Sequence, residues 1–149
     1  MVDVGFTQAW FKDEGRFVKK SLRVAQQLRY KYLIALEGND IASGLKWMLF
    51  SDSVVLMPAV KVATWALEGT LQPFVHYIPL KPDGSDLLQM VRWARSNDGK
   101  VREISRRATL FMYDFLFHPD AASDNAEVRS ILVKRYEAGV RLKGAPRAC

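Results

Sequence analysis

Cysteine and histidine are scarce in this 149-residue sequence, which limits the chemistry it can support. The one cysteine, Cys149, is the last residue, so neither an internal disulfide nor a cysteine-based metal site can form. The two histidines, His76 and His118, are far apart and lack the short spacing of a zinc-binding pair. A disulfide framework is therefore excluded, and a metal site is disfavoured.

Long apolar segments are missing as well. No apolar run approaches the roughly 20 residues that a membrane-spanning helix needs. The first residues, MVDVGFTQAWFKDEGR, lack the basic segment and apolar stretch of a secretory signal peptide. The sequence shows no internal repeat, and Met1 reads as an arbitrary start.

Positive charge is in excess, with 22 Lys and Arg against 16 Asp and Glu, a net charge of +6. This surplus favours an anionic partner, either a nucleotide, a phosphate, a nucleic acid or a membrane surface, unless it only aids solubility. The basic clusters at 16–23, 101–107 and 133–143 fall on helical patterns, where charges are usually solvated. Because no aromatic residues interleave with them, we expect no nucleic-acid partner.

Apolar runs alternate with helical patterns along the chain. With 49% hydrophobic residues, the sequence suffices for one domain with one core. Strand–helix alternation predicts an α/β fold with a parallel sheet and covering helices. The expected strands are 31–36, 53–58 and 74–80. Three short helices are expected: one capped by Ser21, one from Ile41 and one ending at Gly69. Longer helices are expected at 87–96, 101–117 and about 123–142, with a break at 97–99.

The carboxyl ends of parallel strands meet at one edge of a sheet, where ligands of such folds bind. In this sequence those ends are Glu37–Asp40, Met57–Val60 and Leu80–Asp83. The sequence therefore predicts one rim made of three loops.

The first of these loops, LEGNDIASGLKW, ends a buried strand and leads into a helix. Gly38 allows a ligand to approach the backbone, the amides at a helix start suit a diphosphate, and Lys46 adds a positive charge. The alternative is an ordinary turn in which Asn39 or Asp40 caps the helix. Spacing alone favours the capped turn.

Glu68 follows the second strand on the same predicted rim. A carboxylate there can accept the hydroxyl hydrogens of a ribose. The alternative, which the pattern favours, is an exposed helix residue before Gly69.

The remaining candidates favour structural roles. We expect Trp65 and Phe74 in the core, His76 as a structural histidine, and Asp83 and Asp86 as turn and cap residues. No Ser/His/Asp constellation or paired-carboxylate spacing is present, so we assign no catalytic residue.

The order of the motifs resembles the C-terminal half of family-90 glycosyltransferases. That family includes fungal capsule-associated proteins, lipopolysaccharide-modifying proteins and animal protein O-glucosyltransferases. KYLIALEGNDIASGLKWML, SDSVVLMP and TWALEGTLQPFVHYIPLKPDGSDLLQMVRWARSND follow one another as in the family, over roughly residues 22–117. The positions that match its pattern are Lys31, Tyr32, Gly38, Ser43, Lys46, Ser53, Val54, Trp65, Leu71, Pro73, Val75, His76, Tyr77, Pro79, Lys81, Asp83, Ser85, Asp86, Leu87, Trp93, Asn97 and Asp98.

The resemblance implies the donor-binding, Rossmann-like domain of a two-domain GT-B enzyme. Such an enzyme would transfer a sugar from a UDP-sugar, its substrate, to a glycan or protein hydroxyl, with no metal or cofactor. In the animal enzymes an arginine precedes the lysine of this turn, and Leu45 stands there instead. The variant resembles a microbial and algal branch, so Lys46 or the helix amides would neutralise the diphosphate. By the resemblance we expect Gly38, Asn39, Asp40, Ser43 and Lys46 near the diphosphate; Glu68 is expected near the ribose from its place on the predicted rim.

The same resemblance divides the chain into three parts. Residues 1–20 are expected to be an irregular lead-in from a missing N-terminal domain, which would hold the acceptor site and the general base. Residues 21–120 form the donor domain, and 121–149 a C-terminal helix with a basic tail. By analogy the protein would work in the secretory lumen or at a membrane; the alternative is a remnant that binds or only folds.

Overall fold

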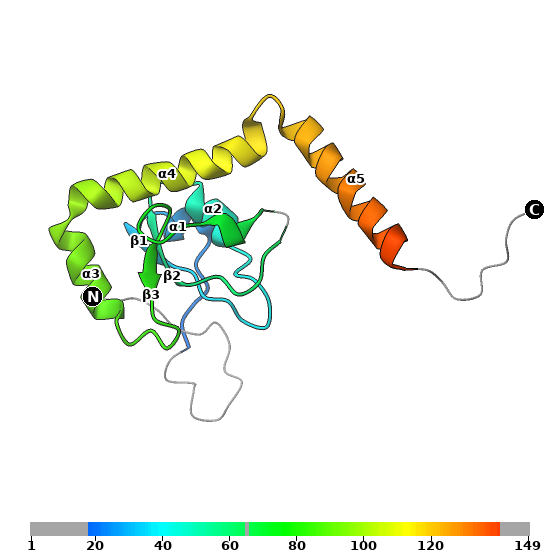
Figure 1. Cartoon of the computed structure of the whole chain (residues 1–149). Helices are drawn as coiled ribbons and strands as arrows, with labels where there is room; N and C mark the ends of the chain where they lie inside the picture. Colours follow the sequence, from blue (N-terminus) through cyan, green and yellow to red (C-terminus); the bar gives the residue numbers. More distant parts are fainter. Residues whose placement is uncertain (1–17, 65, 141–149) are drawn as a thin grey trace, which may run out of the picture.

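The computed structural model describes residues 18–64 and 66–140, which form a small α/β unit with one long projecting helix (Figure 1). Expectations for Trp65, Cys149, the first 17 residues and the basic tail beyond residue 140 lie outside the described residues. The elements are α1 (Val24–Gln27), β1 (Tyr32–Ile34), α2 (Leu45–Leu49), β2 (Val54–Pro58), η2 (Glu68–Thr70), β3 (Ile78–Leu80), α3 (Leu87–Ser96), α4 (Asp98–Phe117) and α5 (Ala121–Gly139).

The three strands form a parallel sheet in the order β1-β2-β3. Tyr32 pairs with Val54, and Leu56 pairs with Ile78, so β2 lies in the centre. Its first four residues are buried, as expected for a strand covered on both faces. The predicted parallel α/β fold is confirmed.

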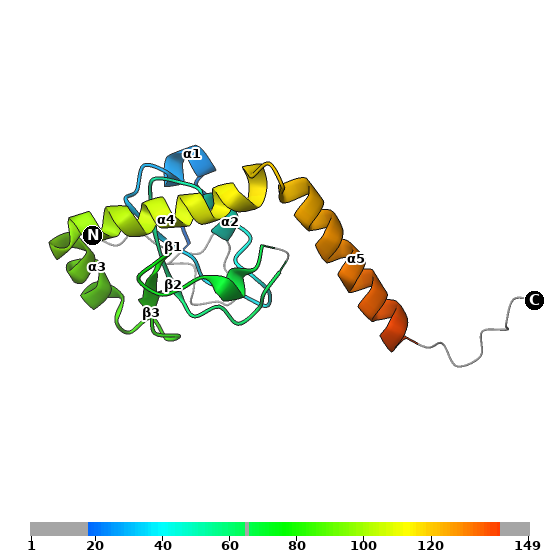
Figure 2. The ribbon, with the colours of Figure 1, turned by 45° about the horizontal axis from the view of Figure 1, so that its top comes forward.

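Alternate residues of β2 point into two separate parts of the core. Val55 and Met57 pack with α2 and the second half of α4, whereas Val54 and Leu56 pack with α3 and the first half of α4. Helices therefore cover both faces of the sheet, and α4 contributes to both clusters (Figure 2). The helix expected at 101–117 is present as α4 and buries one stripe, which contains Val101, Ile104, Ala108 and Met112.

Two helix starts differ from the sequence prediction. The helix expected from Ser21 begins at Val24, where the amide of Arg23 donates to the Gln26 side chain at 2.9 Å. The expected break at 97–99 is a single residue, because Asn97 ends α3 and also precedes the first residue of α4. Asp98 and Gly99 are helical.

Two residues of the family pattern tie the sheet to α4. Lys31, just before β1, pairs with Asp98, and Arg102 Nε lies 3.0 Å from the same carboxylate. Hydrogen bonds from Lys31 and then Arg102 hold the pKa of Asp98 below its ordinary value. Because the cluster is solvent-exposed, it fixes position more than it adds stability.

The third strand is shorter than predicted, because Phe74–His76 form a turn rather than its first half. The amides of Val75 and His76 donate to the carbonyl of Gln72, and Phe74 has a left-handed φ of 58°. That conformation costs a bulky residue about 1–2 kcal/mol. Phe74 is also 45% exposed, so the prediction of a core phenylalanine is wrong.

Helix α5 was predicted at about 123–142 and is found at Ala121–Gly139. It contacts the end of α4 and then projects away from the sheet in both views (Figures 1 and 2). None of its residues is buried in this chain.

Candidate functional site

The carboxyl ends of the three strands line one hollow of about 190 Å³. Ala35 to Glu37 follow β1, Met57 to Lys61 end and follow β2, and Pro82 follows β3. Ala42 and Leu45, from the loop before α2 and its first residue, complete the lining. The rim predicted from the strand order is therefore present in the structure.

The first rim loop differs from the capped turn that the spacing favoured. Helix α2 begins at Leu45, not near Ile41, and the N-cap residue is Gly44, which makes no side-chain cap. Asp40 Oδ1 instead accepts a hydrogen bond of 2.8 Å from the amide of Ile41. The alternative in which Asn39 or Asp40 caps the helix is wrong, since several residues separate them from its start.

The two glycines of this loop have different surroundings. A Cβ added to Gly38 would meet nothing within 4 Å, whereas one added to Gly44 would lie 3.0 Å from Trp47 Nε1. Gly44 is thus packed against α2, while Gly38 borders open space. Among residues 18–64 and 66–140, nothing lies within 4 Å of a Cβ built on Gly38.

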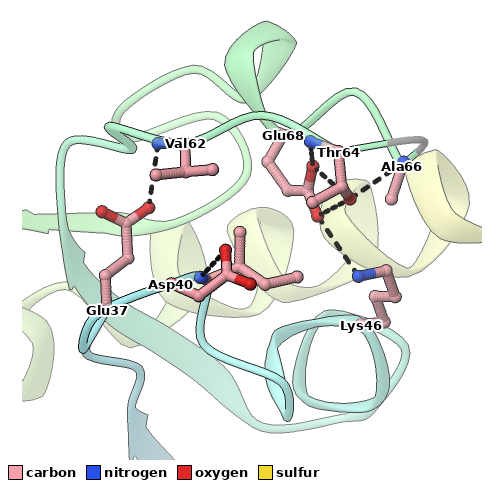
Figure 3. Close-up of polar contacts among 8 residues, drawn as sticks. Glu37, Asp40, Lys46, Val62, Thr64, Ala66 and Glu68 are labelled. Carbon is pink, nitrogen blue, oxygen red and sulfur yellow. Dashed lines mark hydrogen bonds and ion pairs between the residues drawn. The ribbon is translucent and has the colours of Figure 1, made fainter.

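Lys46 and Glu68 point toward one another across the rim (Figure 3). Lys46 Nζ lies 3.3 Å from Glu68 Oε1, and the Thr64 hydroxyl donates to both carboxylate oxygens at 2.7 and 2.9 Å. The Thr64 amide donates to Oε2 at 2.7 Å. The Glu68 side chain is only 3% exposed, so the alternative of a solvent-exposed helix residue is wrong.

Burial by itself would raise the pKa of Glu68. Hydrogen bonds from the Thr64 hydroxyl, the Thr64 and Glu68 amides and Lys46 outweigh burial and hold its pKa below the ordinary 4.5. The carboxylate is therefore ionised at neutral pH and anchors the ammonium of Lys46.

This shift predicts an acid-sensitive contribution to folding. Because the folded-state pKa of Glu68 is lowered, the stabilisation is complete above about pH 4.5 and is lost as pH falls through the folded-state value. Urea unfolding measured from pH 7 to pH 3 should show a weaker acid dependence in Glu68→Gln than in the unmodified chain. Asp83 and Asp98 also have lowered pKa values and contribute equally to both proteins, so identical acid dependences would contradict the assignment.

Glu37 is a rim residue to which the sequence analysis gave no role. Its carboxylate accepts hydrogen bonds from the amide of Lys61, at 3.2 Å to each oxygen. It also accepts one of 3.5 Å from the amide of Val62 (Figure 3). These contacts hold the loop after β2 against the end of β1. The sequence feature that could have identified this role is an acidic residue directly after the expected strand 31–36.

The structure brings together only part of the predicted donor set. Lys46 and Glu68 are in contact, while Gly38, Asn39, Asp40 and Ser43 are exposed in the loop before α2. None of these six residues lines the 190 Å³ hollow, although Glu37 and Leu45, the chain neighbours of Gly38 and Lys46, do.

His76 has the predicted structural role. Its Nδ1 accepts a hydrogen bond of 3.0 Å from the amide of Gln72, and its ring lies 5.2 Å from that of Phe111. Burial, with the nearby charge of Arg107, lowers its pKa, which keeps the imidazole neutral at physiological pH.

Asp83 and Asp86 organise the loop after β3. Asp83 accepts from the amide of Ser85 at 3.1 Å, as expected for a turn residue. Asp86 is the N-cap residue of α3, but its side chain accepts from the amide of Lys81 at 2.9 Å instead of capping the helix.

Among residues 18–64 and 66–140, no three His, Cys, Asp or Glu side chains are grouped as metal ligands. No helix within these ranges is long and apolar enough to cross a membrane.

Comparison with known proteins gives consistent matches. A sequence model described as glycosyl transferase family 90 matches residues 1–122. The O-glucosyltransferase LpsA of Dichelobacter nodosus is 38% identical over 97 residues, which are 65% of this chain and 30% of that protein. Protein O-glucosyltransferase 3 of Homo sapiens is 30% identical over 122 residues, 78% of this chain and 23% of the relative. The chain thus spans less than a third of the length of these relatives.

Proposed function

Since the chain belongs to glycosyltransferase family 90, we propose that it is the donor-binding part of an enzyme that moves a sugar from a UDP-sugar to a hydroxyl acceptor. The names of both relatives favour glucose as the sugar, and the name of the human relative favours a protein as the acceptor. The acceptor site and the general base are expected in a domain outside this chain.

The observation that carries this proposal is the hollow at the carboxyl ends of β1, β2 and β3. Parallel α/β sheets bind nucleotides at this edge, because the loops that follow the strands converge there. A donor nucleotide would enter at this hollow, and Lys46 directly follows Leu45, one of its lining residues.

We assign to Lys46 the role of neutralising the negative charge of the diphosphate. It is anchored by Glu68, and 24% of its side-chain surface remains exposed. A lysine held in place can neutralise a diphosphate without a metal ion, as basic side chains do in phosphoryl-group recognition. Gly38, Asn39, Asp40 and Ser43 would then form the loop over the phosphates.

The ribose role of Glu68 stays a prediction. Both of its oxygens already accept hydrogen bonds from Thr64. Binding a ribose would require exchange of at least one of these bonds or use of a remaining lone pair. The present contacts favour Glu68 as the residue that positions Lys46.

Calorimetric titration of the chain with UDP-glucose, UDP-xylose and UMP, with and without EDTA, tests the proposal. We expect UDP-glucose to bind with EDTA present and UDP-xylose to bind no more tightly. UMP should bind at least tenfold more weakly than UDP-glucose, because it lacks both the second phosphate and the sugar. Loss of binding in EDTA would contradict metal independence. No binding of any nucleotide would favour the alternative, a remnant that keeps only the fold.

The Gly38→Ala variant tests the place of the donor. Its new methyl group enters open space, so stability should be unchanged or slightly raised, while UDP-sugar binding should weaken at least tenfold if the diphosphate approaches this backbone. Gly139→Ala is the matched control, because a Cβ there also meets nothing within 4 Å but lies at the end of α5. Equal UDP-sugar affinity of Gly38→Ala and Gly139→Ala would mean that the diphosphate does not approach the backbone at Gly38.

A further inference from the structure

A second and larger hollow lies away from the donor rim. Its volume is about 630 Å³, and it is lined by Phe74, Trp93, Gly99, Lys100, Glu103, Ile104 and Arg107. Phe74 precedes β3, and the residues from Gly99 onward belong to the first turns of α4. None of its lining residues is shared with the 190 Å³ hollow.

Two aromatic rings form one side of this second hollow. The rings of Phe74 and Trp93 lie 5.1 Å apart in an edge-to-face arrangement, and Phe74 is 45% exposed. Phe74 keeps this position with a left-handed φ of 58°, which a glycine would adopt without strain. A strained bulky residue that remains half-exposed contributes little to the core, and such residues gather at binding sites.

Charged side chains from α4 also line this hollow. Lys100 and Arg107 supply two positive charges, and Glu103 supplies one negative charge. Glu103 is paired with Arg107 at 3.0 Å and with Arg106 at 3.8 Å. The lining therefore carries one more positive than negative charge, next to an apolar ring surface.

From this arrangement we propose that the second hollow binds a saccharide that carries a carboxylate, such as a uronic acid unit. One face of a pyranose ring presents C–H groups, which the negative face of an aromatic ring attracts. Its hydroxyls can donate to Glu103, and its carboxylate can accept from Lys100 and Arg107. The single excess charge suits a carboxylate better than a phosphate dianion.

The volume and the mixed lining agree with this ligand. Sites for small molecules usually measure about 300–1,000 Å³ and combine apolar surface with a few polar groups. A Cβ on Gly99 would meet nothing within 4 Å, so backbone at the start of α4 also borders open space. The site is independent of the proposed donor function, because Lys46 and Glu68 take no part in it.

Titration of the ¹⁵N-labelled full chain with trigalacturonic acid, followed by NMR, tests this site. We expect shifts of the Gly99 and Lys100 amides and of the Trp93 indole N–H, with at least tenfold weaker binding in Phe74→Gly and in Arg107→Gln. Arg106→Gln is the matched control, since Arg106 also pairs with Glu103 but does not line the hollow; its affinity should stay within twofold. Lys46→Met should bind the saccharide as the unmodified chain does.

Three outcomes would overturn the proposal. They are the absence of shifts at millimolar trisaccharide, equal binding of the neutral maltotriose, and tighter binding of UMP that depends on the same two residues. Phe74→Gly should keep the fold, because glycine relieves the left-handed strain. If its melting curve shows otherwise, Arg107→Gln decides the result alone.

Discussion

Replacing Lys46 with methionine should abolish the stabilisation that a UDP-sugar gives this chain. At a ligand concentration of a hundred times the dissociation constant, binding to the folded state adds about 2.7 kcal/mol to the free energy of unfolding. Methionine keeps most of the apolar stem of lysine but removes the ammonium that faces Glu68 and, in our proposal, the diphosphate. Thermal melting with and without UDP-glucose measures the difference.

Lys134→Met is the control for this experiment. Lys134 lies on α5, is exposed and is remote from the rim, so the same loss of one positive charge should leave nucleotide stabilisation intact. If both variants lose the stabilisation by UDP-glucose, the nucleotide is attracted only by the net positive charge of the protein. If neither loses it, Lys46 does not contact the donor.

The strands and long helices could be predicted because their signals are local. The apolar runs around Leu33 and Val55 and the stripe of α4 each bury a face that the residue pattern itself defines. The prediction for the first half of the third strand was wrong. FVHY has a strand-like composition, but hydrogen bonds to the Gln72 carbonyl turn its backbone. No residue pattern encodes that left-handed turn.

Only part of the candidate site could be predicted from the sequence. The rim could be predicted from strand order alone, because the carboxyl ends of parallel strands lie at one edge. The burial of Glu68 did not follow, since it depends on Lys46, 22 positions away, and on Thr64 in the loop between β2 and η2. The second hollow was also beyond the sequence, because it joins residues from three separate segments.

Replacing Glu68 with alanine should destabilise the chain by about 3 kcal/mol. The change leaves the amide and hydroxyl of Thr64 and the ammonium of Lys46 without their acceptor, and an unsatisfied buried polar group costs about 1–3 kcal/mol. For a chain of this size, the loss corresponds to a fall in melting temperature of roughly 6–12 °C. Urea unfolding gives the free energy directly, and Glu137→Ala on α5 should stay within about 0.5 kcal/mol of the unmodified chain.

The double variant shows whether Glu68 acts on Lys46 or only supports the loop around Thr64. If the ion pair contributes to folding, Lys46→Met costs about 1 kcal/mol alone and clearly less when Glu68 is already alanine, which is the non-additivity expected of contacting residues. Additive losses would mean that the 3.3 Å contact carries no coupling. The affinity for UDP-glucose is then measured in the same variants. If Glu68 acts by positioning Lys46, Glu68→Ala should weaken binding strongly in the unmodified chain and far less in Lys46→Met.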